Sequence, residues 1–127
     1  MLIPVESLLS DSHFPIQIAL LAGSDLVTNL RLLSEEVGWG DDAVSVCPWV
    51  ALDDWDKRCI EKYDGFDLTM VNGYRVVISV TDMYYDMCLA SKIYIERHPE
   101  AMSELQTIQE NYRKHFGLNE HGEEPHA

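Results

Sequence analysis

The segment FDLTMVNGYRVVISV, residues 66–80, constrains the fold more than any other part of the chain. Its two runs alternate in polarity on either side of Asn72-Gly73, which is typical of a β-hairpin. A two-residue turn would mix apolar and charged side chains on one face, whereas a loop of residues 71–73, with Gly73 in the left-handed region, separates the faces. This register pairs Phe66 with Ile78, Leu68 with Val76 and Met70 with Tyr74 on the apolar face. It leaves Asp67, Thr69, Arg75 and Val77 on the other face.

An apolar hairpin face needs a cover, and the sequence predicts helices that supply it. Apolar residues recur at helical spacing in residues 26–37, 82–98 and 99–116. Gly38 and Gly117 are placed to end the first and the last of these helices, and Thr81 is placed to cap the second. Pro99 separates the second helix from the third. A short helix is also expected over residues 15–22, with Pro15 in its first turn.

The stretch GWGDDAVSVCPWVALDDWD, residues 38–56, contains all three tryptophans and five aspartates. Residues 43–47 resemble a short strand that ends at Pro48. Asp53 or Asp54 is expected to cap a helix closed by Gly65, with Trp55, Cys59, Ile60 and Tyr63 on its inward face. On this interpretation Trp49 and Trp55 are core or core-rim residues. Trp39 lies between two glycines, outside any periodic face, and is the candidate for exposure.

These elements predict an α+β fold with a single small domain over residues 1–117. Its helices pack on the antiparallel hairpin, or on a three-stranded sheet that includes residues 43–47. The length of 127 residues fits one domain, and residues 118–127 form a polar tail. No apolar run approaches the roughly 18 residues of a membrane span. Acids rather than bases precede the apolar segment 14–23, unlike a signal peptide, so we expect a cytoplasmic protein.

Charge is the unusual property of the composition. The chain has 22 Asp and Glu residues against 9 Lys and Arg residues, a formal net charge of −13. Residues 1–56 hold ten acids and one base, a net charge of −9, and residues 57–127 hold twelve acids and eight bases, a net charge of −4. A field of this sign repels nucleic acids and anionic membranes and attracts basic protein surfaces. An acidic surface also serves plain solubility, which is the alternative interpretation.

The residue pattern does not predict catalysis, a metal site or a cofactor. The five histidines lack the spacing of common metal-binding motifs, and the sequence has no nucleophile elbow or phosphate-binding glycine loop. The three cysteines, Cys47, Cys59 and Cys88, are odd in number and widely spaced. We interpret them as reduced thiols that act as small buried hydrophobic residues.

The candidate partner-binding residues are acids together with aromatic side chains. The acids are expected to provide charge complementarity, with Trp39 as an anchor. Tyr84 and Tyr85 are neighbours on one predicted helix, so one of the two is expected to face outward near Asp82 and Asp86. The acids of the candidate set are Asp41, Asp42, Asp53, Asp54, Asp56, Asp64 and Asp67.

Charge, size and the lack of a catalytic motif together favour a small acidic interaction protein that binds and blocks a basic protein surface. The expected partner is a nuclease, a toxin or a nucleic-acid-binding enzyme, and the expected type is an inhibitor or an immunity protein. A narrower hypothesis is a nucleic-acid mimic of phage or plasmid origin. The alternatives are an enzyme or small-molecule binder whose site is assembled from scattered residues, such as Cys47 with a histidine, and an accessory or assembly subunit.

Overall fold

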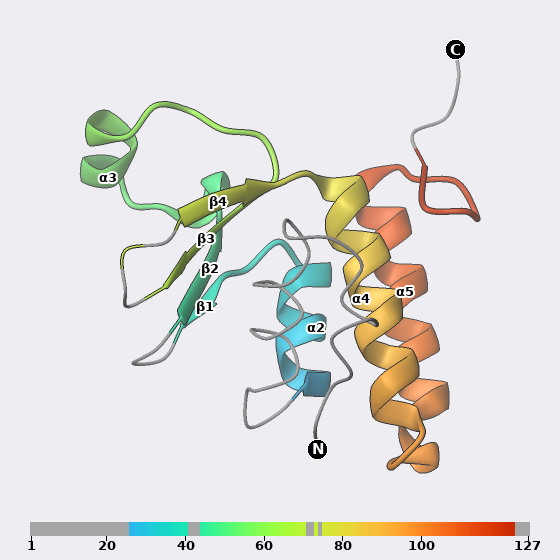
Figure 1. Ribbon diagram of the computed structural model, residues 1–127. Coiled ribbons are helices and arrows are strands. Elements are labelled where there is room, and N and C mark those ends of the chain that lie inside the picture. The colour runs from blue at the N-terminus through green and yellow to red at the C-terminus, as the bar shows by residue number, and fades with distance from the viewer. Residues whose placement is uncertain (1–25, 41–43, 71–72, 74, 124–127) are drawn as a thin grey trace.

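The computed structural model describes residues 26–40, 44–70, 73 and 75–123, so the helix predicted over residues 15–22 lies outside the described residues. The described chain has the predicted α+β architecture, with helices and one antiparallel sheet (Figure 1). The elements in chain order are α2 (Leu26–Ser34), β1 (Trp39–Gly40), β2 (Val44–Pro48), the 3₁₀ turn η2 (Trp49–Ala51), α3 (Asp54–Cys59), β3 (Phe66–Met70), β4 (Arg75–Ile78), α4 (Val80–Ile95), the 3₁₀ turn η3 (Pro99–Ala101) and α5 (Met102–Phe116).

The sheet has the strand order β1-β2-β3-β4, and each neighbouring pair is antiparallel. The sequence predicts three of these strands. The fourth, β1, is only two residues long and pairs Trp39 with Val46. Pro48 is the last residue of β2, as expected for a residue that has no N–H to donate to a ladder.

The hairpin register is confirmed. Phe66 pairs with Ile78 and Leu68 with Val76, while Asp67 pairs with Val77 and Thr69 with Arg75 on the other face. Gly73 has a φ of +92°, and its N–H donates to the carbonyl of Met70 at 2.9 Å. Tyr74 lies outside the described residues, so the predicted Met70–Tyr74 pair is not described.

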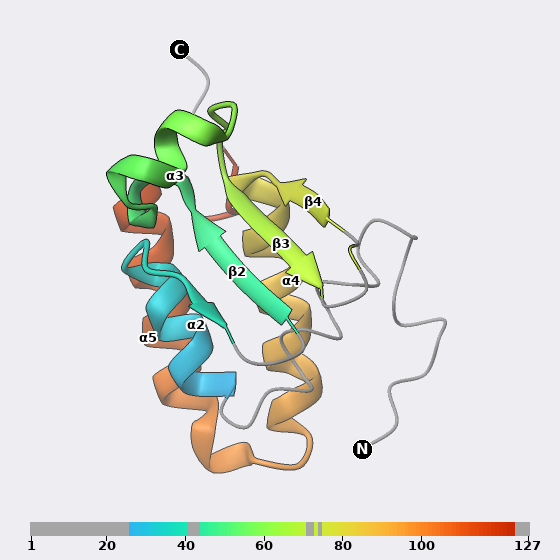
Figure 2. The same ribbon diagram turned by 90° about the vertical axis from the view of Figure 1, so that its left-hand side faces the viewer.

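Three helices cover one face of the sheet. Helices α2, α4 and α5 lie together on that face, and α5 contacts both of the others (Figure 1). The short helix α3 lies on the opposite side, near the end at which β2 leaves the sheet, and no other described helix covers this second face (Figure 2). The core between the sheet and the helices consists of Leu26, Leu30, Leu33, Val46, Phe66, Leu68, Ile78, Met83, Met87, Ala90, Leu105, Ile108 and Tyr112.

Tyr112 is the largest side chain at the centre of this core and is fully buried. Its ring stacks on Phe66 at a centroid distance of 6.4 Å and on Tyr84 at 5.8 Å, and it contacts Phe116 at 4.6 Å. Its hydroxyl donates to the carbonyl of Val80 at 2.7 Å, which ties α5 to the first residue of α4. A single α5 side chain therefore joins the hairpin to the helical layer.

The C-terminal end of α2 differs from the prediction. Helix α2 ends at Ser34, and Glu36 rather than Gly38 adopts the left-handed conformation, with a φ of 59°. The N–H groups of Glu36 and Val37 donate to the carbonyls of Leu33 at 3.0 Å and Leu32 at 2.8 Å, the paired bonds of a Schellman cap. The carboxylate of Glu36 also lies 2.9 Å from Nε2 of His115 on α5, and this contact stabilises a residue with a side chain where glycine is usual.

The cap of α4 also differs. The helix begins two residues earlier than predicted, because Ser79 rather than Thr81 is the N-cap and its Oγ accepts the N–H of Asp82 at 3.1 Å. Helix α4 ends at Ile95, three residues before the predicted end, and Pro99 begins η3; Gly117 closes α5 as predicted, with a φ of +69°.

Residues 118–123 of the predicted polar tail form a compact turn. Asn119 Oδ1 accepts the N–H groups of His121 at 2.9 Å and Glu123 at 3.0 Å, and Leu118 packs against the core. Gly122 is buried beside the ring of Tyr84. The last residues of the predicted tail, 124–127, lie outside the described residues.

Candidate functional site

The predicted partner-binding residues do not form one patch in the structure. Asp53, Asp54, Asp56 and Asp64 belong to α3 and the segment around it, whereas Tyr84 and Tyr85 lie on α4, on the other side of the sheet (Figure 1). Asp41 and Asp42 lie outside the described residues. The acids around α3 and the tyrosines of α4 are therefore separate candidate surfaces.

The aspartates of α3 lie at the N-terminal end of the helix. Asp53 is the N-cap, as predicted, and its Oδ1 accepts the N–H of Asp56 at 2.7 Å. Asp53 and Asp54 are exposed, and Asp56 is half-buried. Lys57 and Arg58 occupy the last turn. Acids at the first turn and bases at the last turn stabilise a helix through its dipole, so part of this charge pattern has a structural role.

Trp55 corrects the prediction of an inward-facing helix. Its side chain is 70% exposed, Cys59 is exposed, and α3 buries none of its residues. The helix is only six residues long and ends before Tyr63, which the sequence places on the same face. A helix of this length offers a stripe of only two apolar residues, and the inner face of the sheet is already covered by the other helices.

An exposed surface results, which we call the α3 surface and define as Val50, Asp53, Asp54, Trp55 and Asp56. Val50 lies in the 3₁₀ turn before α3 and is 56% exposed. Trp49 in the same turn packs instead, with its ring edge-on to Tyr63 at 5.5 Å. The α3 surface thus combines exposed apolar side chains with carboxylates in one short segment. The sequence signal that could have indicated the exposure of Trp55 is its position between Asp54 and Asp56.

Two other candidates have different surroundings from those predicted. Trp39 in β1 is half-buried and packs against the core. Asp67 is buried, at 8% exposed, and its carboxylate accepts hydrogen bonds from Thr69 Oγ1 at 2.7 Å and from Arg75 Nε. The carboxylate of Asp67 therefore stabilises the hairpin. Asp64, in contrast, is exposed in the segment before β3.

The tyrosine pair divides as the helical geometry predicts. Tyr85 is 48% exposed, whereas Tyr84 is half-buried against Tyr112 and Gly122. Burial raises the pKa of Tyr84 to about 12. Asp86 is fully buried, so only Asp82 of the two nearby acids is exposed beside Tyr85.

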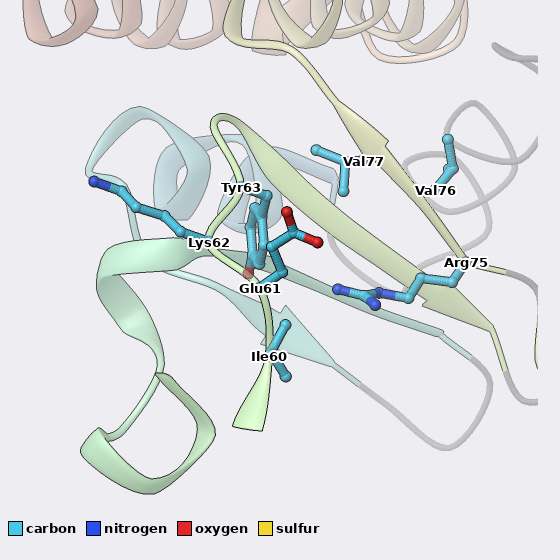
Figure 3. A pocket seen from close by; sticks show the side chains of 7 residues that line it. All are labelled: Ile60, Glu61, Lys62, Tyr63, Arg75, Val76 and Val77. Carbon is cyan, nitrogen blue, oxygen red and sulfur yellow. The ribbon is translucent and has the colours of Figure 1, made fainter. Parts of the chain in front are cut away.

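A pocket of about 320 Å³ lies on the uncovered side of the sheet (Figure 3). It forms between residues 60–63, which follow α3, and residues 75–77 of β4. These two segments are distant in the sequence, so no local sequence pattern predicts the pocket. The Tyr63 hydroxyl donates to the carbonyl of Cys47 at 2.9 Å, and burial raises the pKa of Tyr63 to about 12. The lining residues are Ile60, Glu61, Lys62, Tyr63, Arg75, Val76 and Val77.

The cysteines are more exposed than predicted, and the surroundings of two of them disfavour the nucleophilic thiolate. All three are free thiols: Cys59 is exposed, and Cys47 and Cys88 are half-buried. The Cys47 thiol donates to the carbonyl of Pro48 at 3.4 Å, and burial raises the pKa of Cys47. Burial likewise raises the pKa of Cys88. Raised pKa values favour the thiol over the thiolate, which is the reactive form.

Comparison of the chain with family models, with curated proteins and with solved structures finds no match. Within residues 26–123, so far as they are described, no helix has the length and apolarity to cross a membrane. In the same part of the chain, no three His, Cys, Asp or Glu residues converge as ligands for a metal ion. The α3 surface is the candidate site that combines exposed apolar area with the charge sign of the whole chain.

Proposed function

We propose that the protein is a small acidic interaction protein that binds and blocks a basic protein surface, as an inhibitor or an immunity protein does. The proposed partner is a nuclease, a toxin or a nucleic-acid-binding enzyme, in the cytoplasm. The observation that carries the proposal is the exposure of Trp55, 70%, beside exposed aspartates in a chain of net charge −13. Tryptophan is the residue most typical of binding hot spots, and a strong negative field steers a cationic partner toward its site.

The alternative interpretation of the charge is solubility alone, and the exposed apolar side chains argue against it. Solubility is served by carboxylates without an exposed indole, whereas a highly exposed tryptophan is the kind of side chain that anchors binding interfaces. The α3 aspartates also differ from the buried Asp67 in their exposure, while the Asp53 carboxylate additionally caps α3. The carboxylate of Asp67 is ion-paired with Arg75, whereas Asp53 and Asp54 are exposed to solvent.

The proposal is tested by capture from lysate of the source organism with the tagged protein, after nuclease treatment, at low and at high salt. We expect one basic protein that is retained at low salt and weakened at high salt, because exposed charges are screened beyond about 8 Å at physiological ionic strength. Retention of no basic protein at either salt concentration would contradict the proposal. Competition between the captured partner's nucleic-acid ligand and this protein distinguishes a nucleic-acid mimic from an inhibitor that binds elsewhere.

A charge-matched pair of variants locates the surface. The first carries Asp53→Asn, Asp54→Asn and Asp56→Asn, which removes three charges and keeps a capping side chain at position 53. The control removes three charges at the opposite end of the molecule, at the α4–α5 turn, through Glu96→Gln, Glu100→Gln and Glu104→Gln (Figure 1). We expect the first variant to associate about tenfold more slowly and the control to change much less. Equal effects would exclude the α3 surface as the docking site.

A further inference from the structure

Trp55 is the most exposed large hydrophobic side chain of the described residues, at 70%, ahead of Val50 at 56%. The side chain of Trp55 is not part of the hydrophobic core. Helix α3 is capped by the Asp53 carboxylate, buries none of its residues and contributes nothing to the hydrophobic core. An indole that extends from such a helix leaves on the order of 150 Å² of apolar area in contact with water. That area is available to a partner at no cost to the packing of the core.

The charges around Trp55 define what would cover it. Asp54 and Asp56 directly precede and follow Trp55, so in a helix their side chains diverge to either side of the indole. Lys57 and Arg58 follow in the last turn of α3, and Arg58, three residues after Trp55, lies on the same helical face as Trp55. A complementary surface therefore has an apolar pocket for the indole, lysine or arginine side chains opposite the aspartates, and an acceptor opposite Arg58.

We infer that Trp55 is the anchor of the interface and inserts into an apolar pocket, rimmed by Lys and Arg, on a basic protein partner. This inference rests on the proposed function and assigns different kinetic roles to the aspartates and to the indole. The aspartates act at a distance and set the rate of association, whereas the desolvated indole sets the rate of dissociation. The structure assigns the anchor to Trp55 in place of Trp39, because Trp39 packs against the core.

The test compares Trp55→Ala with the control Met102→Ala. Met102 is 49% exposed at the start of α5, far from α3, so this variant also loses an exposed apolar side chain (Figure 1). Binding to the partner captured by the wild-type protein is followed by surface plasmon resonance at several salt concentrations. For Trp55→Ala we expect a dissociation rate at least about thirtyfold higher, with an association rate and a salt dependence close to wild type. Met102→Ala is expected to bind like the wild type.

A second measurement uses only the wild-type protein and does not depend on the folding of a variant. Oxidative footprinting with mass spectrometry reports the exposure of each tryptophan, free and in the complex. We expect Trp55 to be labelled strongly in the free protein and to be protected in the complex, with little change at Trp39 and Trp49. Full labelling of Trp55 in the complex, or wild-type binding by Trp55→Ala, overturns the inference and leaves the proposed function intact. Failure of the wild-type protein to retain any basic partner overturns both.

Discussion

Replacement of Gly65 by alanine tests the close approach that sets the start of the hairpin. Gly65 directly precedes β3 and has a φ of +97°. A Cβ at this position would lie 2.1 Å from the carbonyl oxygen of Ile78 and 3.0 Å from the Cα of Ser79. Both of these atoms are backbone, so no side-chain rotation relieves the overlap. The chain at the end of β4 would have to move by roughly 1 Å, and this would disturb the packing of Phe66 and Ile78 in the core.

Gly73 provides a control that separates overlap from backbone strain. Its φ of +92° is nearly the same as that of Gly65, but a Cβ there would have no atom within 4 Å. Gly73→Ala therefore reports the strain of an L-residue at positive φ, about 1–2 kcal/mol. Gly65→Ala adds the backbone clash, and we expect its total cost to reach about 3–5 kcal/mol.

Urea denaturation at neutral pH, followed by far-UV circular dichroism and by tryptophan fluorescence, measures both variants against the wild type. The prediction is a free energy of unfolding that falls at least about 2 kcal/mol further for Gly65→Ala than for Gly73→Ala, with similar m-values. Equal losses for the two variants would show that the contact between Gly65 and the carbonyl of Ile78 is not present in solution. The reasoning from steric overlap would then be wrong.

Three further predictions concern hydrogen bonds and the ion pair of the hairpin. Burial raises the pKa of Tyr63 to about 12, above the usual value of about 10, so the folded state retains a proton that the unfolded chain loses. Stability is therefore complete below about pH 10 and falls toward pH 12, and Tyr63→Phe should make this fall shallower in urea titrations across that range. Arg75→Met leaves the buried carboxylate of Asp67 without its cation. Because Arg75 is half-exposed, we expect a loss of about 1–2 kcal/mol, larger than that of Asp67→Asn; the reverse order would contradict the ion-pair argument. Tyr112→Phe removes the donor to the Val80 carbonyl and should cost about 0.5–1.5 kcal/mol by urea denaturation; unchanged stability would show that this hydrogen bond contributes nothing.

The parts of the fold that the sequence predicts are those with a repeated pattern. The hairpin register follows from period-two alternation in two strands that share one turn. A register shift of one residue would move an apolar side chain such as Phe66 or Ile78 from the core face to the other face of the sheet. Likewise, Leu105, Ile108 and Tyr112 repeat at helical spacing over two turns of α5, and all three are buried. Each added repeat makes chance agreement with the pattern less frequent.

The features that the sequence misses depend on contacts between distant parts of the chain. Strand β1 is two residues long, and its pairing with β2 cannot be read from so short a segment. The prediction that Trp55 faces inward is wrong because it requires a second element for the helix to pack against. Helix α3 instead lies on the side of the sheet that the other described helices do not cover. The burial of Asp67 did have a signal. The predicted register already places Asp67 diagonally across from Arg75 on one face, where opposite charges attract.

Both edge strands of the described sheet are short, with two residues in β1 and four in β4, against five in each inner strand. A neighbouring molecule that extended the sheet would gain few backbone hydrogen bonds at either edge. Among the described residues, the sheet therefore offers little backbone edge for strand addition, beside a face that the described helices leave largely uncovered (Figure 2). We therefore expect a partner of this face to be recognised by side chains, which are more selective than a backbone edge that accepts any extended chain.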